Sequence, residues 1–216
     1  MLKKFVAGAF VFTAGAMFVP ITSQTALAAA KPTSQQIAHD PVHEVRRVMA
    51  EAADRAIGDD PIAAMLELVN KPDRDRIEKD ITKKQDKAYQ DLADQVRKLW
   101  KDKYGHNFSA EGHIDELTDL DVHLTGTGKD EKATVDFPAE PGEAAYELHL
   151  VRQASNHWWR IELPDSFTAK NFYPSLQQSL QRVIDEKDKL PGSEAKAYSR
   201  VVTWVLHEMA FPKGAK

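Results

Sequence analysis

The sequence predicts an α+β domain in which N-terminal helices precede a four-stranded antiparallel meander sheet, wrapped on a long helix, and two C-terminal helices. Three observations carry this prediction. Helix-start signals and apolar residues at helical spacing cover 41–105. Apolar and polar residues alternate over 121–163, which is typical of strands with one buried face. Helical spacing then returns over 174–210.

Residues 1–28 have the pattern of a secretory signal peptide. Lys3 and Lys4 precede an uncharged, mostly apolar run over 5–19, and Ala-Leu-Ala at 26–28 supplies small residues at both cleavage-site positions. The alternative is a retained N-terminal anchor, but a spanning helix needs about 20 apolar residues. We therefore expect cleavage after Ala28 and a periplasmic or secreted protein.

The mature chain is expected to be a single α+β domain over 29–216. Without the two leader lysines, 27 basic residues face 33 acidic ones, which gives a net charge of −6 with neutral histidines. Nucleic acids and anionic membranes select clustered Lys and Arg, so we expect no nucleic-acid partner. No other stretch is long and apolar enough to span a membrane once the signal is removed. The chain has no cysteine, so its core must stabilise it without disulfides.

Two aspartate–proline pairs mark the first helices. Asp40-Pro41 places a capping residue before a proline suited to the first helical position, and apolar residues recur until Gly58, which predicts a helix over 41–57. Asp60-Pro61 repeats this signal before an apolar stripe that runs from Ile62 to Val69.

A longer helical region follows and ends at Gly105. It is either one long helix or two abutting helices, because a strongly polar stretch at 82–87 interrupts the apolar stripe. Charges of both signs are interspersed at 73–87, which favours a solvated face over a binding patch.

Four strands are predicted next. Residues 121–125 and 132–137 flank a turn-forming Gly-Thr-Gly-Lys-Asp-Glu segment and form a hairpin, with Val122, Leu124, Ala133, Val135 and Phe137 on the core parity. Residues 144–152 and 157–163 form the last two strands. Because the strands are consecutive and closely spaced, a meander is the simplest topology.

The last two strands divide their side chains between two faces. The core parity carries Tyr146, Leu148, Leu150, Trp159, Ile161 and Leu163, and the opposite parity carries Glu147, His149, Val151, Trp158, Arg160 and Glu162. A symmetric pairing places His149 opposite Arg160, whereas a slip of two residues places it opposite Glu162.

Two interpretations of the polar face compete. It is either a solvated sheet surface with cross-strand ion pairs, or a concave surface that helices close into a pocket walled by Trp158. The candidate pocket residues are Glu147, His149, Trp158, Arg160, Glu162 and His123. A metal could be held by His123, His149 and Glu147, but the histidines lack a close ligand spacing, so the sequence predicts no metal site and no cofactor.

The C-terminal region is predicted to form two helices. One begins near Tyr173 with an apolar stripe through Leu176, and Pro191-Gly192-Ser193 separates it from the second. Trp204 and His207 fall off the apolar stripe of the second helix, so they pack in the core, are exposed, or contact another element or a partner.

The order of these elements resembles the cystatin-like and NTF2-like α+β domains of bacterial envelope proteins. The resemblance covers roughly 60–165 and rests on a helix ending near Lys-Asp-Lys-Tyr-Gly, followed by a meander whose last strand reads His-Trp-Trp-Arg-Ile-Glu-Leu-Pro. It implies a curved sheet around a helix, and a role as a ligand binder, an interaction module or, in a minority of members, a dehydratase or isomerase. The two C-terminal helices depart from the simple family pattern, and no Asp/His dyad motif matches.

We therefore expect a non-catalytic domain that binds an unknown small molecule or an envelope protein. Gly126-x-Gly128 lacks the spacing of a phosphate loop, and no Gly-x-Ser-x-Gly nucleophile motif occurs. One alternative is a small isomerase, dehydratase or hydrolase with His149 or Glu147 as general base. Another is a structural oligomer, and a homodimer is compatible with either role.

Overall fold

The computed structural model describes residues 40–58, 61–81, 87–139, 144–153 and 158–211. The leader expected at 1–28 lies outside these residues, as does most of the polar stretch at 82–87. All described residues fall in one compact unit. None of the described helices has the length and apolar content that a membrane span requires.

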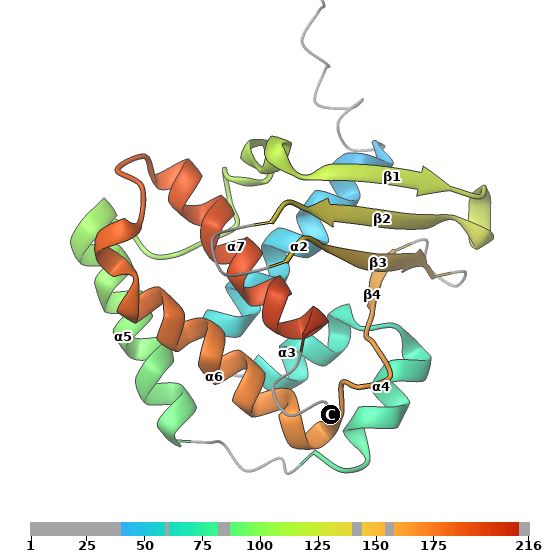
Figure 1. Ribbon diagram of the computed structural model, residues 1–216, viewed down its shortest axis with the longest axis horizontal. Coiled ribbons are helices and arrows are strands. Elements are labelled where there is room, and N and C mark those ends of the chain that lie inside the picture. Colours follow the sequence, from blue (N-terminus) through green and yellow to red (C-terminus); the bar gives the residue numbers. More distant parts are fainter. Residues whose placement is uncertain (1–39, 59–60, 82–86, 140–143, 154–157, 212–216) are drawn as a thin grey trace, which may run out of the picture. The chain divides into compact units, whose positions relative to one another are not determined.

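The architecture is α+β, as the sequence predicts. Six α-helices are described: α2 (Pro41–Ile57), α3 (Pro61–Leu68), α4 (Lys71–Glu78), α5 (Lys87–Tyr104), α6 (Ala169–Asp185) and α7 (Glu194–Ala210). Four strands form one antiparallel meander in the order β1 (Asp121–Thr125), β2 (Lys132–Phe137), β3 (Tyr146–Arg152) and β4 (Trp159–Glu162). N-terminal helices, sheet and C-terminal helix pair thus follow one another along the chain (Figure 1).

Helix α2 has the bounds that its capping residues predict. The side chain of Asp40 accepts a hydrogen bond from the backbone N–H of Val42 at 2.9 Å, and Pro41 occupies the first turn. One side of the helix is buried through residues such as Val45 and Met49. This helix packs on α7, α3 and both edge strands of the sheet.

The region after α3 differs from the predicted stripe. Val69 lies beyond α3 and forms a parallel bridge with Ile161 of β4. The next residue, Asn70, caps helix α4 by accepting a hydrogen bond from Asp73 N–H at 2.9 Å. The backbone N–H of Asn70 also donates to Ile161 O at 2.9 Å. The α3–α4 link therefore pairs with the outer edge of β4.

The long helical region forms two helices, α4 and α5, in place of one long helix. They do not abut, because α4 ends at Glu78 and α5 begins at Lys87. Helix α5 ends at Tyr104, and Gly105 follows with a φ of 88°, a conformation that favours glycine. The helix packs along α6, and the two lie away from the sheet (Figure 1).

Helix α6 begins five residues before the expected position 174. Thr168 and Asn171 form a capping box at its start, so Pro174 lies inside the helix and not at its expected first position. Helix α7 begins after Ser193, as expected, and Trp204 is buried in the core at 1% exposure. The guanidinium of Arg182 lies 4.6 Å from the centre of the Trp204 ring.

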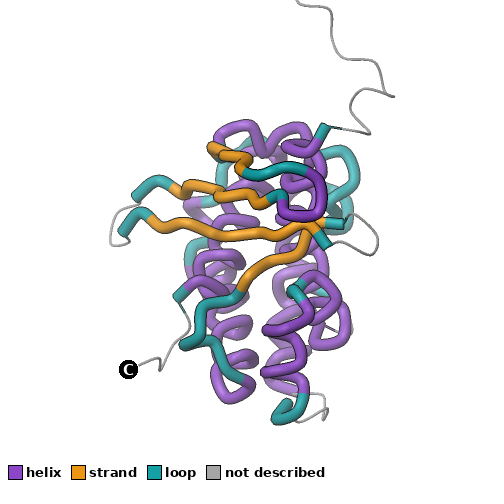
Figure 2. Tube along the Cα trace, turned by 90° about the vertical axis from the view of Figure 1, so that its right-hand side faces the viewer, coloured by secondary structure: helices purple, strands orange, loops and turns teal. Residues whose placement is uncertain are grey.

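The sheet buries one face. All six residues assigned to the core parity of β3 and β4 are buried, and Ala133, Val135 and Phe137 of β2 are buried beside them. Edge strand β1 departs from this pattern, because Leu124 is 37% exposed and Val122 is only partly buried. Helices α2, α3 and α7 contact the covered face, and Figure 2 shows the strands in front of the helices.

The hairpin between β1 and β2 is confirmed. A short 3₁₀ turn at Gly128–Asp130 connects the strands, and Gly126 has a φ of 75° where any added side-chain carbon would collide with the carbonyl of Asp130. The Gly-Thr-Gly segment is thus a turn, and its glycines serve backbone geometry.

Candidate ligand site on the outer sheet face

The uncovered face of the sheet carries two rows of polar side chains, which the strand register sets side by side. His149 lies opposite Glu162, which is the slipped register of the two that the sequence left open. One row is formed by Asp121, Asp136 and Glu147, and the next by His123, Thr134, His149 and Glu162. Acidic and imidazole groups therefore gather on one face, while the apolar residues between them point into the core.

A surface hollow of about 590 Å³ lies at the β3–β4 side of this face. Its floor is formed by Glu147, His149 and Glu162, three of the residues that the sequence singled out. Residues of α4, of the link after β4 and of the end of α7 form its walls, among them Asp73, Asp165 and Phe211.

The wall at α4 is fixed by hydrogen bonds to the link after β4. One carboxylate oxygen of Asp73 accepts from Leu163 N–H at 2.9 Å, and the other pairs with Arg76 Nη2 at 2.8 Å. Arg76 also donates to the backbone carbonyls of Asp165 and Pro164, each at 3.3 Å. These contacts hold one side of the hollow in a defined position.

The opposite wall carries an exposed aromatic ring. Phe211 is 50% exposed, and its ring centre lies 5.6 Å from that of Tyr146 and 5.2 Å from that of His207. Tyr146 is itself anchored, because its hydroxyl donates to Thr203 O at 3.0 Å. The backbone and neighbours therefore orient Phe211 while half of its surface stays available to a ligand.

The floor side chains contact one another weakly and remain accessible. His149 Nε2 lies 3.9 Å from a carboxylate oxygen of Glu147, and His149 Nδ1 lies 3.4 Å from the hydroxyl of Thr134. The side chains of His149 and Glu147 are 54% and 62% exposed. Four carboxylates line the hollow, from Asp73, Glu147, Glu162 and Asp165. Among the residues that the structure describes, Arg76 pairs with Asp73, and the imidazole of His149 lies near Glu147. The hollow therefore favours positively charged ligands.

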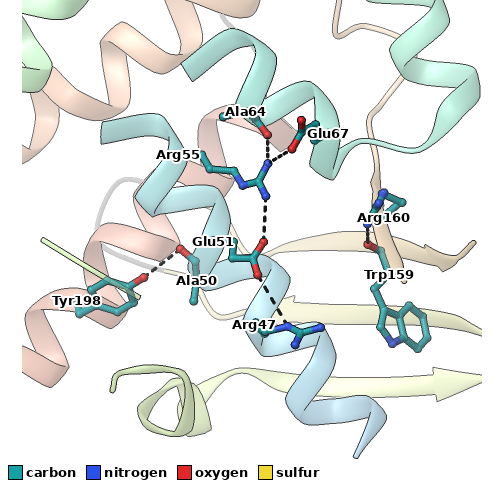
Figure 3. Close-up of polar contacts among 9 residues, drawn as sticks. All are labelled: Arg47, Ala50, Glu51, Arg55, Ala64, Glu67, Trp159, Arg160 and Tyr198. Atoms are coloured by element: carbon teal, nitrogen blue, oxygen red, sulfur yellow. Dashed lines mark hydrogen bonds and ion pairs between the residues drawn. The ribbon is translucent and has the colours of Figure 1, made fainter. Parts of the chain in front are cut away.

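Trp158 and Arg160 lie apart from this hollow. Trp158 is 53% exposed, and the guanidiniums of Arg47 and Arg160 lie 5.9 and 5.4 Å from its ring centre. Arg160 Nη1 donates to the carbonyl of Trp159 at 2.9 Å (Figure 3). Burial lowers the pKa of Arg160, and the nearby positive charge of Arg55 adds to this effect.

A ladder of ion pairs on α2 extends beside Arg160. Glu51 pairs with Arg55 at 3.3 Å and with Arg47 at 3.8 Å, and Arg55 continues to Glu67 of α3 at 2.9 Å (Figure 3). Trp158 thus packs beside charged side chains of a helix edge and does not wall the hollow.

His123 is separated from the other candidates. Thr134 lies between it and His149 in the register, so the combination of His123, His149 and Glu147 is not assembled. His123 instead contacts Asp121 and Asp136, two residues that the sequence analysis did not single out. Both aspartates occupy outward-facing positions of β1 and β2, so they could have been identified once the pairing of these two strands was known.

Asp73, Asp165 and Phe211 were also missed. They reach the hollow from a helix, a link and a chain segment that are distant in sequence from β3, so no local pattern places them there. Comparison of the chain with protein-family models, curated proteins and solved structures found no match. The resemblance to cystatin-like and NTF2-like domains therefore stays a prediction.

Proposed function

We propose that the protein is an exported, non-catalytic binding module of the cell envelope that holds an organic cation in the hollow beside β3 and β4. The observation that carries the proposal is the lining of the hollow, which combines four carboxylates with an accessible aromatic ring. Export rests on the leader pattern of residues 1–28.

The chemistry of the hollow fits an aliphatic diamine or polyamine. Ammonium groups form charge-assisted hydrogen bonds with Glu147 and Glu162, and the hydrocarbon between them contacts Phe211. Because these carboxylates remain in contact with water, each contact contributes little, about 1 kcal/mol or less. Four such contacts supply at most about 4 kcal/mol, so we expect a dissociation constant on the order of 1 mM for a small diamine.

Binding accounts for this site better than catalysis. A general base gains from a site that excludes water, whereas the His149 side chain is more than half exposed. His149 also contacts Glu147 at 3.9 Å, too far for the hydrogen bond that orients a catalytic imidazole. The side chains of the floor therefore act as polar recognition groups.

Isothermal titration calorimetry with 1,5-diaminopentane tests the proposal, and 1,5-pentanediol is the matched ligand in which hydroxyls replace the charges. We expect the diamine to bind and the diol to fail. Glu147→Gln and Glu162→Gln should each weaken diamine binding several-fold, because each removes a charge that faces the ligand. Glu111→Gln, an exposed carboxylate outside the hollow, is the control and should change nothing.

Equal binding of the diamine and the diol would contradict an electrostatic site. Equal weakening by all three Glu→Gln substitutions would show that the diamine responds only to the overall negative charge. Turnover of a ligand that is lost in His149→Ala would instead support the enzyme alternative.

A further inference from the structure

A second cluster on the outer sheet face lies outside the hollow. His123 Nε2 of β1 is 3.0 Å from Asp136 Oδ2 of β2 and 3.4 Å from Asp121 Oδ2 of its own strand. The three donor atoms all lie within 4.8 Å of one another. One imidazole nitrogen and two carboxylate oxygens therefore converge on one point of the surface.

The two nitrogen–oxygen distances are close to those between neighbouring donors in a metal coordination shell. In a tetrahedral zinc site the metal–nitrogen and metal–oxygen bonds are about 2.0–2.1 Å, so neighbouring donor atoms lie about 3.3 Å apart. The imidazole nitrogen of His123 has this separation from both carboxylates. Small rotations of the aspartate side chains would place a metal ion at the centre of the three donors.

The sheet fixes the three residues in this arrangement. Asp121 and Asp136 are directly opposite in the β1–β2 register, and His123 follows Asp121 at the next outward position. Because the β1–β2 pairing is continuous over five residue pairs, the donors are mounted on regular structure and not on a loop.

The row of acids gives an independent electrostatic reason for a cation. Asp136 has Asp121 opposite on one side and Glu147 opposite on the other. Carboxylates directly opposite on neighbouring strands repel one another, whereas sheets are stabilised by opposite charges at such positions. Within the described ranges, both aspartates find their ion-pair partner in His123 alone. A divalent cation would offset this repulsion while His123 coordinates in its neutral form.

We infer that Asp121, His123 and Asp136 form a binding site for a divalent transition-metal ion, with Zn²⁺ as the representative probe. One nitrogen and two oxygen donors suit Zn²⁺ and its first-row neighbours better than Mg²⁺ or Ca²⁺, which take oxygen ligands. Three protein ligands leave at least one coordination position for water or for a donor from another molecule. The inference goes beyond organic-cation binding, and none of the three proposed metal ligands lines the hollow.

The test is calorimetric titration of the full, untagged chain with ZnCl₂. We expect one ion per chain, with a dissociation constant in the micromolar range because the ligands are solvent-exposed. His123→Ala and Asp136→Asn should each weaken binding by about tenfold or more. His149→Ala is the matched control, because its side chain is 54% exposed against 55% for His123 and lies on the same face.

Nuclear magnetic resonance of the imidazole nitrogens supplies a second readout. Zn²⁺ should shift the Nε2 signal of His123 and leave that of His149 in place. Zinc affinity that is unchanged in His123→Ala, or that falls equally in His149→Ala, would overturn the inference. An absence of zinc binding below 1 mM would also overturn the inference. It would show that His123 serves only as an ion-pair partner of the aspartates. Diamine binding should persist in His123→Ala, so failure of the metal site and failure of the hollow are distinguishable.

Discussion

The adjacent tryptophans Trp158 and Trp159 should differ sharply in what they contribute to stability. Trp159 is 1% exposed and Trp158 is 53% exposed, so the two side chains lie on opposite faces of the same strand end. A fully buried tryptophan removes roughly 150–250 Å² from water, worth about 4–6 kcal/mol at 25 cal/mol per Å². Trp159 Nε1 is buried without a hydrogen-bond partner, so the lower end applies. We expect Trp159→Ala to cost about 4 kcal/mol.

Trp158→Ala should cost much less. About half of its surface is already exposed, and its contacts with the guanidiniums of Arg47 and Arg160 contribute roughly 0.5–1 kcal/mol each. The expected loss is about 1–2 kcal/mol. For a domain of this size, 1 kcal/mol corresponds to about 2–4 °C in Tm, so the two variants should differ by about 4–12 °C.

Urea unfolding followed by far-ultraviolet circular dichroism measures both losses, and differential scanning calorimetry gives the Tm values. If Trp159→Ala does not fold, Trp159→Phe preserves the comparison because it still leaves a void in the core. Losses of the two alanine variants that agree within about 1 kcal/mol would refute the assignment of Trp158 to an uncovered surface.

Two further predictions concern ionisation and processing. Burial raises the pKa of Tyr89 and of Tyr198, whose hydroxyl donates to Ala50 O at 3.0 Å, so the folded state holds these protons more tightly than the unfolded state. The contribution of these two tyrosines to stability is therefore complete below about pH 10 and is lost as the pH rises beyond it. Absorbance at 295 nm should show two tyrosines that ionise only when the protein unfolds. Full reversible titration of all five tyrosines in the folded state would disprove this. The leader predicts that protein recovered from its own host begins at Ala29, which N-terminal sequencing checks, and a chain that begins at Met1 would contradict export by cleavage.

Local signals were sufficient to predict most of the fold. Asp40-Pro41 and Gly58 fix both ends of α2, and period-two alternation identifies the buried face of β3 through residues such as Leu148 and Leu150. Where the prediction failed, long-range pairing outweighed the local pattern. Val69 continues an apolar stripe in sequence, yet it pairs with Ile161 because Asn70 begins a new helix.

The candidate site was predictable only in part. The outward parity identified Glu147, His149 and Glu162, and all three line the hollow. The same parity grouped them with Arg160, whose surroundings depend on α2 and α3 at the edge of the sheet. Apolar–polar alternation alone does not determine how β3 pairs with β4, nor which helix packs on a strand edge, because both depend on tertiary contacts.

Binding of an organic cation in the hollow between β3, β4 and the end of α7 can be observed residue by residue. The experiment is a titration of the ¹⁵N-labelled protein with 1,5-diaminopentane, followed by ¹H–¹⁵N correlation spectra. We expect saturable shifts at the amides of Glu147, His149, Glu162 and Phe211, and no response to 1,5-pentanediol. Saturable shifts confined to other surfaces, or an unchanged spectrum at millimolar diamine, would contradict it.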